Sequence, residues 1–241
     1  MKKTFTAPIL ILLFFTFIIG KAQEPLNNDV ENKRYVLVPN GLSLRKEKTL
    51  KSERITVMPL RSEVTLLKEP LGNTFEVEHI KGSMIKVLFN DTIGYCFSGY
   101  LSQLPLPKKT QSAQAYIDEL KEQFSGTSFK TKPNSPDFHQ GSTDTFTLPT
   151  TSWHEAYYIV CALYKIPKSL GFPNPSGPKK ETIPQPDKPK KTWSSELSIT
   201  RKDNTLTSIN YFLRLEGFGT SITIIRLDNG FFQVEDLAYV D

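Results

Sequence analysis

The sequence predicts two folded parts: an all-β small barrel at residues 33–104, and an α+β domain at residues 112–241 in which two helices pack on an antiparallel β-meander. Three observations indicate this division. Short runs of β-branched and aromatic residues alternate with turn residues through the first part. Two segments with helical periodicity follow it. The chain then closes with long alternating runs separated by turns at Asp203-Asn204 and Asn229-Gly230.

The first 22 residues have the pattern of a secretory signal peptide. Lys2 and Lys3 precede an apolar run, and small residues at Gly20 and Ala22 predict cleavage between Ala22 and Gln23. We therefore expect a periplasmic or secreted protein. The alternative is an uncleaved N-terminal anchor. No later apolar run has this length, so we expect no transmembrane segment in the mature chain.

The charge of the chain argues against a nucleic-acid partner. Its formal net charge is +5, but the leader contains three lysines and no acidic residue, which leaves 27 basic and 25 acidic residues. Proteins that bind nucleic acid usually have a strong basic excess on one domain.

Three motifs in the first part come in the order typical of one domain family. Leu42-Ser43-Leu44-Arg45 is similar to a Leu-Asn-Val-Arg segment, and Met84-Ile85-Lys86-Val87 is similar to a Trp-x-Lys-Val strand. Ile93-Gly94-Tyr95-Cys96, followed by Tyr100-Leu101, resembles a closing Thr-Gly-Tyr-Val…Tyr-Leu signature. Residues 33–104 therefore resemble a bacterial SH3 domain.

This resemblance implies an SH3-like barrel that binds extended peptides, and it covers less than a third of the chain. The sequence departs from the family in several places, including a missing Gly-Pro after the arginine and a longer hairpin at residues 69–82. Met84 stands where the family usually has Trp, and Arg61-Ser62-Glu63 replaces a Lys-Gly-Thr turn.

A short linker at residues 105–111, rich in Pro and Lys, leads into the second part, for which no family is recognised. Ser112 is the expected cap of the first helix. Ser152 and Glu155 predict a capping box at the start of the second. Residues 165–192 contain seven prolines and seven lysines, so we expect a disordered, exposed loop inside this domain.

The two cysteines, Cys96 and Cys161, fall in a strand pattern and a helix pattern. An exported protein meets oxidising conditions, so a disulfide between them is one interpretation. The other is two separate buried thiols.

Candidate catalytic groups do not combine into a site. The three histidines have no His or Cys partner at metal-ligand spacing, so we expect neither a metal nor a cofactor. Cys161 lies among apolar residues of a helix, which is typical of a structural thiol rather than a nucleophile. Adjacent acids such as Glu235 and Asp236 point to opposite faces of a strand, which excludes them as a hydrolytic pair. We expect no enzyme.

Aromatic residues of the first part are the predicted ligand-binding residues. Tyr35, Tyr95 and Tyr100 lie in or beside its expected strands, and tyrosine rings give a rigid apolar surface for peptide binding. Tyr95 and Phe97 alternate in one strand, so both cannot face the core unless the strand bulges.

These observations predict an exported, non-catalytic binding or adaptor protein whose SH3-like domain binds a cell-envelope peptide, glycan or protein. Two alternatives remain open. One is an envelope inhibitor or assembly factor that acts through the C-terminal domain. The other is a hydrolase of unrecognised type in that domain.

Overall fold

The computed structural model describes residues 32–70, 72–134 and 141–240, all of which belong to one compact unit. The predicted leader, residues 1–22, lies outside the described residues.

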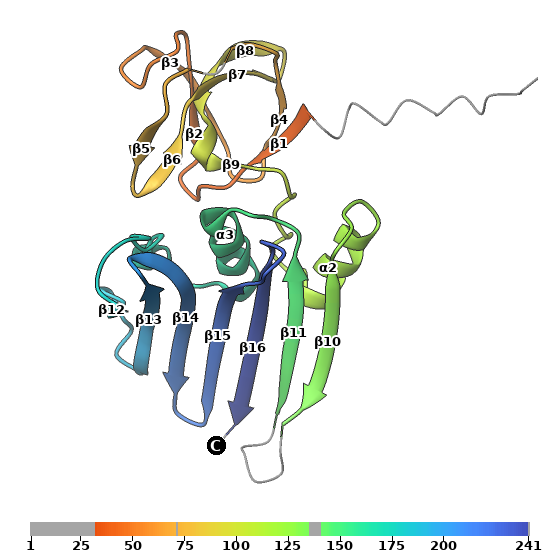
Figure 1. The fold of residues 1–241 in the computed structure, drawn as a ribbon, viewed down its shortest axis with the longest axis vertical. Coiled ribbons are helices and arrows are strands. Elements are labelled where there is room, and N and C mark those ends of the chain that lie inside the picture. Colours follow the sequence, from red (N-terminus) through yellow and green to blue (C-terminus); the bar gives the residue numbers. More distant parts are fainter. Residues whose placement is uncertain (1–31, 71, 135–140, 241) are drawn as a thin grey trace, which may run out of the picture. The chain divides into compact units, whose positions relative to one another are not determined.

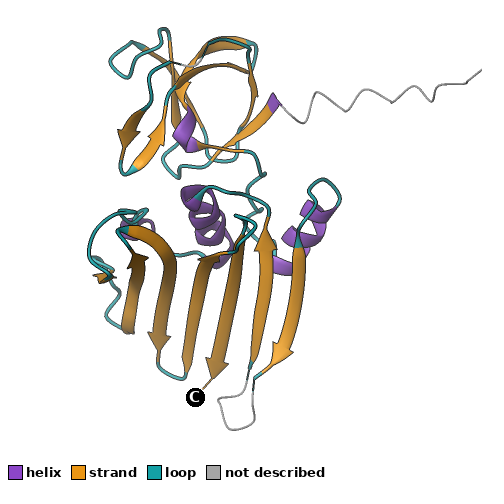
Figure 2. Ribbon diagram, viewed as in Figure 1, coloured by secondary structure: helices purple, strands orange, loops and turns teal. Residues whose placement is uncertain are grey.

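The fold class predicted from the sequence is wrong. The structure is mainly β, with 47% strand and 14% helix, and its strands form two large antiparallel sheets and one hairpin (Figures 1 and 2). This replaces the expected small barrel followed by an α+β domain. The sequence pattern predicted most of the strands, but it could not show how many of them pair into one sheet.

The first sheet has seven strands in the order β3-β2-β8-β7-β4-β1-β9. Their bounds are β1 Lys33–Val36, β2 Leu42–Arg45, β3 Arg54–Met58, β4 Glu63–Leu66, β7 Met84–Phe89, β8 Thr92–Phe97 and β9 Leu101–Ser102. Strands β5 (Phe75–Val77) and β6 (Ile80–Gly82) form the separate hairpin, and the 3-10 helix η1 (Ser98–Tyr100) joins β8 to β9.

Alternation along the strands of the first sheet produces its core. Leu42 and Leu44 are buried on β2, with Ser43 and Arg45 less so, as period-2 geometry requires. On β8, Phe97 is only 2% exposed whereas Tyr95 is not in the core.

The second sheet also has seven strands, in the order β10-β11-β16-β15-β14-β13-β12. Their bounds are β10 Ser128–Pro133, β11 Ser142–Leu148, β12 Lys180–Pro184, β13 Thr192–Lys202, β14 Thr205–Leu215, β15 Phe218–Arg226 and β16 Phe232–Val240. Strands β13 to β16 pair consecutively, and the turn between β13 and β14 holds Asp203 and Asn204 at positive φ. The side chain of Asn229 accepts a hydrogen bond from the amide of Phe231 in the last turn.

Helices α2 (Ala113–Lys121) and α3 (Trp153–Tyr164) lie on one face of the second sheet (Figure 1). Ser112 caps α2 as predicted, because its hydroxyl accepts a hydrogen bond from the amide of Ala115 at 3.2 Å. On α3, Trp153 packs edge-on against Phe232 with ring centroids 4.5 Å apart. Apolar side chains from both helices and from every second position of the strands fill this core.

Glu155, in the first turn of α3, is buried and accepts four hydrogen bonds. Its Oε1 accepts from the hydroxyl of Ser102 and from the backbone amides of Gln103 (2.7 Å) and Leu104 (3.2 Å). Its Oε2 accepts from the hydroxyl of Thr150. One carboxylate therefore ties the end of the first sheet to the start of α3.

The predicted capping box is not formed. Glu155 is used at this junction instead of reaching back, and Ser152 makes no side-chain cap to the helix amides. The hydroxyl of Ser152 contacts the imidazole of His154 instead, 2.9 Å from Nδ1.

The segment 165–192, expected to be a disordered loop, contains the 3-10 helix η2 (Lys168–Leu170) and strand β12. Arg201 on β13, which is 1% exposed, holds this segment through its guanidinium. It donates to the carbonyl oxygens of Asn174 and Pro178 and to the carboxylate of Glu181, the last at 2.7 Å. Buried guanidinium groups require such partners, and the proline-rich segment supplies them.

The second sheet ends in a short polar strand on each side. Strand β10 contains Lys130, Lys132 and Pro133, and strand β12 contains Lys180 and Pro184.

Candidate functional site

The three predicted ligand-binding tyrosines lie on separate elements. Tyr95 is on β8, Tyr35 is on β1 and Tyr100 is in η1. Strands β7 and β4 separate β8 from β1 in the sheet. The structure therefore does not bring Tyr95 and Tyr35 together on neighbouring strands.

Tyr35 pairs across strands with Glu63, which also forms an ion pair with Lys33 at 3.0 Å. Burial raises the pKa of the Tyr35 hydroxyl, Glu63 raises it further, and Lys33 lowers it. The pKa of Tyr35 is raised overall, because burial and Glu63 outweigh Lys33.

Tyr100 is bound to the β5–β6 hairpin. Its hydroxyl donates to Oε2 of Glu78 at 2.8 Å, and its ring packs edge-on against Phe97 with centroids 5.2 Å apart. Burial is the main reason why the pKa of its hydroxyl is raised, followed by the hydrogen bond to Glu78. Glu78 and His79 both have positive φ in the hairpin turn, so Tyr100 supports a strained turn.

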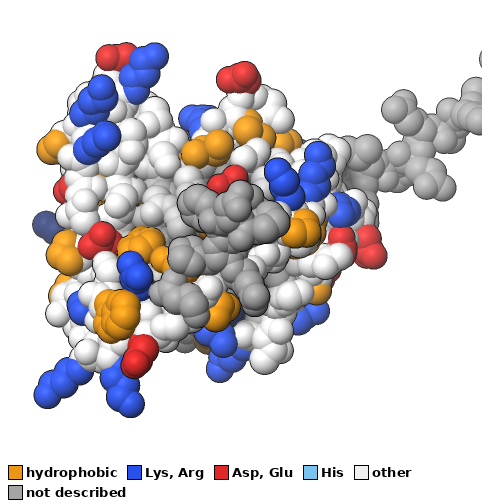
Figure 3. All heavy atoms as spheres, turned by 90° about the horizontal axis from the view of Figure 1, so that it is seen from below, with side chains coloured by type: hydrophobic (Ala, Val, Ile, Leu, Met, Phe, Trp, Pro, Cys, Tyr) orange, Lys and Arg blue, Asp and Glu red, His pale blue; other side chains and the backbone are white. Residues whose placement is uncertain are grey.

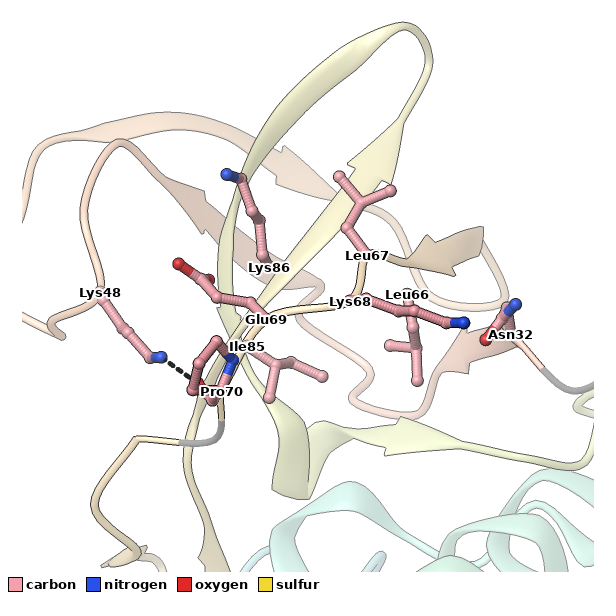
Figure 4. Close-up of a pocket in the computed structure, with 9 residues that line it drawn as sticks. All are labelled: Asn32, Lys48, Leu66, Leu67, Lys68, Glu69, Pro70, Ile85 and Lys86. Carbon is pink, nitrogen blue, oxygen red and sulfur yellow. Dashed lines mark hydrogen bonds between the residues drawn. The ribbon is translucent and has the colours of Figure 1, made fainter.

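The polar contacts of Tyr95 border a pocket of the first sheet, whose lining residues are drawn in Figure 4. Its hydroxyl donates to Oε1 of Glu69 at 3.1 Å, and Nζ of Lys86 lies 6.0 Å from the ring centroid. Both Glu69 and Lys86 line the pocket. The partner of Tyr100, Glu78, lines a different cavity, so of the three predicted tyrosines only Tyr95 has polar contacts that border this pocket.

The pocket has a volume of about 210 Å³ and a lining of nine residues, drawn in Figure 4. Leu66 and Ile85 contribute apolar surface. Three lysines and one carboxylate contribute charge: Lys48, Lys68, Lys86 and Glu69. The pocket is therefore cationic, and its size suits one functional group of a larger ligand rather than a whole ligand.

Lys48 connects this pocket to a second hollow of about 550 Å³. Its Nζ donates to the carbonyl oxygen of Pro70 at 2.5 Å, which fixes the side chain between the two cavities (Figure 4). Leu50, Phe75 and Met84 line the second hollow. An extended ligand can place an anionic group in the first cavity and an apolar group in the second.

The Ser152–His154 contact is the nearest approach to a nucleophile and a base. Burial lowers the pKa of His154, which keeps the imidazole neutral at pH 7. Glu155 does not orient the imidazole, because both of its oxygens accept hydrogen bonds from other groups. The arrangement therefore lacks the third group of a catalytic triad among the described residues.

Both cysteines are free thiols in the structure. Burial raises the pKa of Cys96 and of Cys161 to about 12. A thiol with so high a pKa is neither a nucleophile nor a metal ligand at neutral pH.

Sequence reasoning missed a pair of carboxylates on the helix-covered face of the second sheet. Asp144 on β11 and Asp236 on β16 are direct cross-strand partners. Thr220 donates to Asp236 at 2.8 Å, and Thr131 donates to Asp144 at 2.8 Å. Burial raises the pKa of Asp236, and the charge of Asp144 adds to this effect. Hydroxyl partners and burial mark this pair as part of the packed sheet.

Within residues 32–70, 72–134 and 141–240, no three His, Cys, Asp or Glu side chains group so as to hold a metal ion. No helix in the same part of the chain is long and apolar enough to cross a membrane.

No family model matches the sequence, and neither the curated proteins nor the solved structures give a match. The resemblance to bacterial SH3 domains therefore stays a prediction.

Proposed function

We propose that this chain is an exported, non-catalytic binding or adaptor protein whose first sheet binds an anionic group of a cell-envelope peptide, glycan or protein. The cavity in Figure 4 carries this proposal. Export rests on the predicted leader.

Charge is the main argument for an anionic ligand. Lys48, Lys68 and Lys86 surround the cavity with Glu69 as their only carboxylate among its lining residues. Because Glu69 also accepts the hydrogen bond from Tyr95, it offers limited compensation for three ammonium groups. A carboxylate or phosphate of a ligand would supply the missing negative charge.

Tyr95 supports the same site. Its ring lies under Lys86, which limits the freedom of that ammonium group. A ring and a lysine fixed before binding lose less entropy on binding than two free side chains.

Binding of the exported chain to isolated envelope fractions tests the proposal. The double variant Lys68→Glu, Lys86→Glu reverses two charges at the cavity and is expected to weaken binding at least about tenfold. Binding of the unaltered chain is expected to weaken as salt rises, because the contacts are exposed to solvent.

Lys202→Glu is the matched control, since Lys202 is an exposed lysine at the end of β13, on the second sheet. It should bind as the unaltered chain does. Equal binding by the double variant and the control contradicts a role for this cavity, and turnover of any envelope polymer contradicts a non-catalytic protein.

An apolar patch on the second sheet favours a second candidate function, an inhibitor or assembly factor that binds a protein. Trp193 is 58% exposed, Phe218 is 37% exposed and Val240 is 55% exposed. Phe218 and Val240 are direct cross-strand partners, and Arg214 stacks on Trp193 at 5.4 Å. Figure 3 views the molecule from this end and shows hydrophobic side chains exposed among lysines and arginines.

The two functions can be separated with one substitution. Trp193→Ala should abolish capture of an envelope protein if the patch is the binding surface, because exposed tryptophans contribute strongly to interfaces. If Trp193→Ala leaves binding intact while the lysine double variant weakens it, the first function holds.

A further inference from the structure

A second groove lies where the turns of the first sheet meet the end of α3. Its larger lobe has a volume of about 590 Å³ and its smaller lobe about 310 Å³. The two lobes share six lining residues, so they are parts of one groove: Pro39, Tyr158, Cys161, Ile166, Pro167 and Lys168.

Apart from its charged residues, the larger lobe is lined mainly by apolar side chains, with Tyr158 and Cys161 as the neutral polar residues. Leu37, Leu60, Leu106, Ala162 and Ile166 contribute aliphatic surface. A peptide or a glycan buried here would leave its polar groups without partners, which is costly. A hydrocarbon chain has no such groups and loses only its contact with water.

All charged residues of the larger lobe are basic. They are Arg61, Lys109, Lys165 and Lys168, with no carboxylate among the lining residues. The three lysines form no ion pair within the described part of the chain. Arg61 is held in place, because its Nε donates to the carbonyl oxygen of Pro107 at 2.7 Å.

Two of these cations have left-handed backbone. Arg61 has φ of +72° and Lys165 has φ of +56°, a region in which residues with a Cβ are uncommon. Glycine would fit the C-terminal end of α3 with less strain. The backbone instead places long cationic side chains at two points of the rim.

The smaller lobe adds one carboxylate, Glu78, which already accepts the hydrogen bond from Tyr100. Tyr157, which is 1% exposed, lines it, and its hydroxyl has no hydrogen-bond partner of good geometry among the described residues. Burial raises the pKa of this hydroxyl, and the neighbouring thiol of Cys161 raises it further. This hydroxyl has almost no accessible surface, so Tyr157 contributes its ring and not a hydrogen-bond donor to the lobe. Lys168 lines both lobes and therefore marks where a charged head would lie.

We propose that this groove binds a single-chain aliphatic carboxylate, with its hydrocarbon chain in the larger lobe and its carboxylate at Lys168. The site shares no lining residue with the lysine cavity of the first sheet. It is therefore independent of the proposed envelope-binding function, and either can fail without the other.

Calorimetric titration of the exported chain with laurate, below its micelle concentration, tests the proposal. One laurate is expected to bind per chain. Ala162→Trp fills the larger lobe and is expected to abolish binding. Lys165→Glu with Lys168→Glu leaves the lobe open but is expected to weaken binding at least about tenfold, because it places like charges at the head.

Three controls accompany these variants. Ala115→Trp places the same ring on an exposed position of α2, and Lys202→Glu reverses a distant exposed lysine. Both should bind laurate as the unaltered chain does. The variant Lys68→Glu, Lys86→Glu should also bind laurate normally, which separates this site from the first.

Dodecanol tests the charge of the head. It is expected to bind at least about tenfold more weakly than laurate, since it cannot pair with the lysines. The proposal is overturned if laurate does not bind, if dodecanol binds equally well, or if the folded variant Lys165→Glu, Lys168→Glu binds as the unaltered chain does.

Discussion

Asp144 and Asp236 show how burial and a like charge act on one carboxyl group. Asp236 accepts a hydrogen bond from Thr220, which lowers its pKa, but burial has the larger and opposite effect. The net pKa is raised, so the folded protein favours the protonated acid. The stabilisation from this acid is complete below the usual pKa of 3.8 and is lost as the pH rises through the raised value.

We therefore predict that Asp236→Asn raises the thermal midpoint at pH 7. The amide keeps an oxygen for Thr220 and removes the buried negative charge. The gain should shrink as the pH falls towards 4, because the acid of the unaltered chain is then protonated. Thermal unfolding at a series of pH values measures this. Asp228→Asn, in an exposed turn, is the control, and an equal gain from both variants would contradict the explanation.

Because their contacts differ, Tyr100 and Tyr95 should lose different amounts of stability and binding when each is replaced by alanine. Tyr100→Ala removes both the hydrogen bond to Glu78 and the edge-on contact with Phe97. We expect it to lower the free energy of unfolding by about 2 kcal/mol, less than for a fully buried ring. Compared with Tyr100→Ala, Tyr95→Ala should lower the free energy of unfolding less and weaken envelope binding more. Chemical denaturation and the envelope binding assay, run on both variants, distinguish the two roles, and a larger loss of stability from Tyr95→Ala would contradict them.

Local turns explain which site residues the sequence could have revealed. Asn90 and Asp91 form a two-residue hairpin turn with positive φ, and such a turn fixes the pairing of Lys86 with Tyr95. The lysine beside Tyr95 was therefore predictable. Asp144 and Asp236 lie on strands far apart in the sequence, so no local turn sets their pairing.

At the scale of elements, the strands that carry strong alternation could be predicted, and the edge strands could not. Leu197 and Ile199 alternate with polar residues on β13, and both are buried. Strand β10 shows no such pattern, since five of its six residues are exposed. Strand β12 lies in a proline-rich segment whose order depends on Arg201, a contact that no periodicity can show.

We predict that Arg201→Met destabilises the protein by about 3 kcal/mol, because it leaves the carbonyl groups and Glu181 without their cation. The same substitution should make Lys179 and Lys180 sensitive to trypsin, since Arg201 holds the segment that contains them. Chemical denaturation and timed proteolysis measure the two effects. Lys202→Met, at the next position but exposed, is the control. Unchanged proteolysis in Arg201→Met would show that the strand does not depend on this contact.

At the scale of the whole molecule, Glu155 joins segments that lie about fifty residues apart in the chain. Its four donors come from the end of the first sheet and from the residues before α3. The sequence presents it as a capping residue, because Ser152 stands three positions before it. Its hydrogen-bond donors lie on segments that come together only in the folded protein, so the sequence alone could not identify them.

We predict that Glu155→Ala costs about 3–5 kcal/mol of stability, because it leaves several buried donors without an acceptor. The loss should also weaken the coupling between the sheets, so that unfolding changes from one transition to two. Calorimetry measures both effects. Glu216→Ala, in an exposed turn, should change neither. A single transition of unaltered midpoint in Glu155→Ala would contradict the role of this carboxylate.

The edge strands of the second sheet have a consequence for how the protein behaves at high concentration. An open sheet edge can recruit strands from other copies and so start aggregation. Strand β10 meets solvent with Lys130, Lys132 and Pro133, and strand β12 does so with Lys180 and Pro184. Approaching copies would bring like charges together, and proline lacks the amide that strand pairing needs. With both edges of the second sheet protected in this way, the protein can stay dispersed in solution while its proposed ligand sites, which lie elsewhere, remain open.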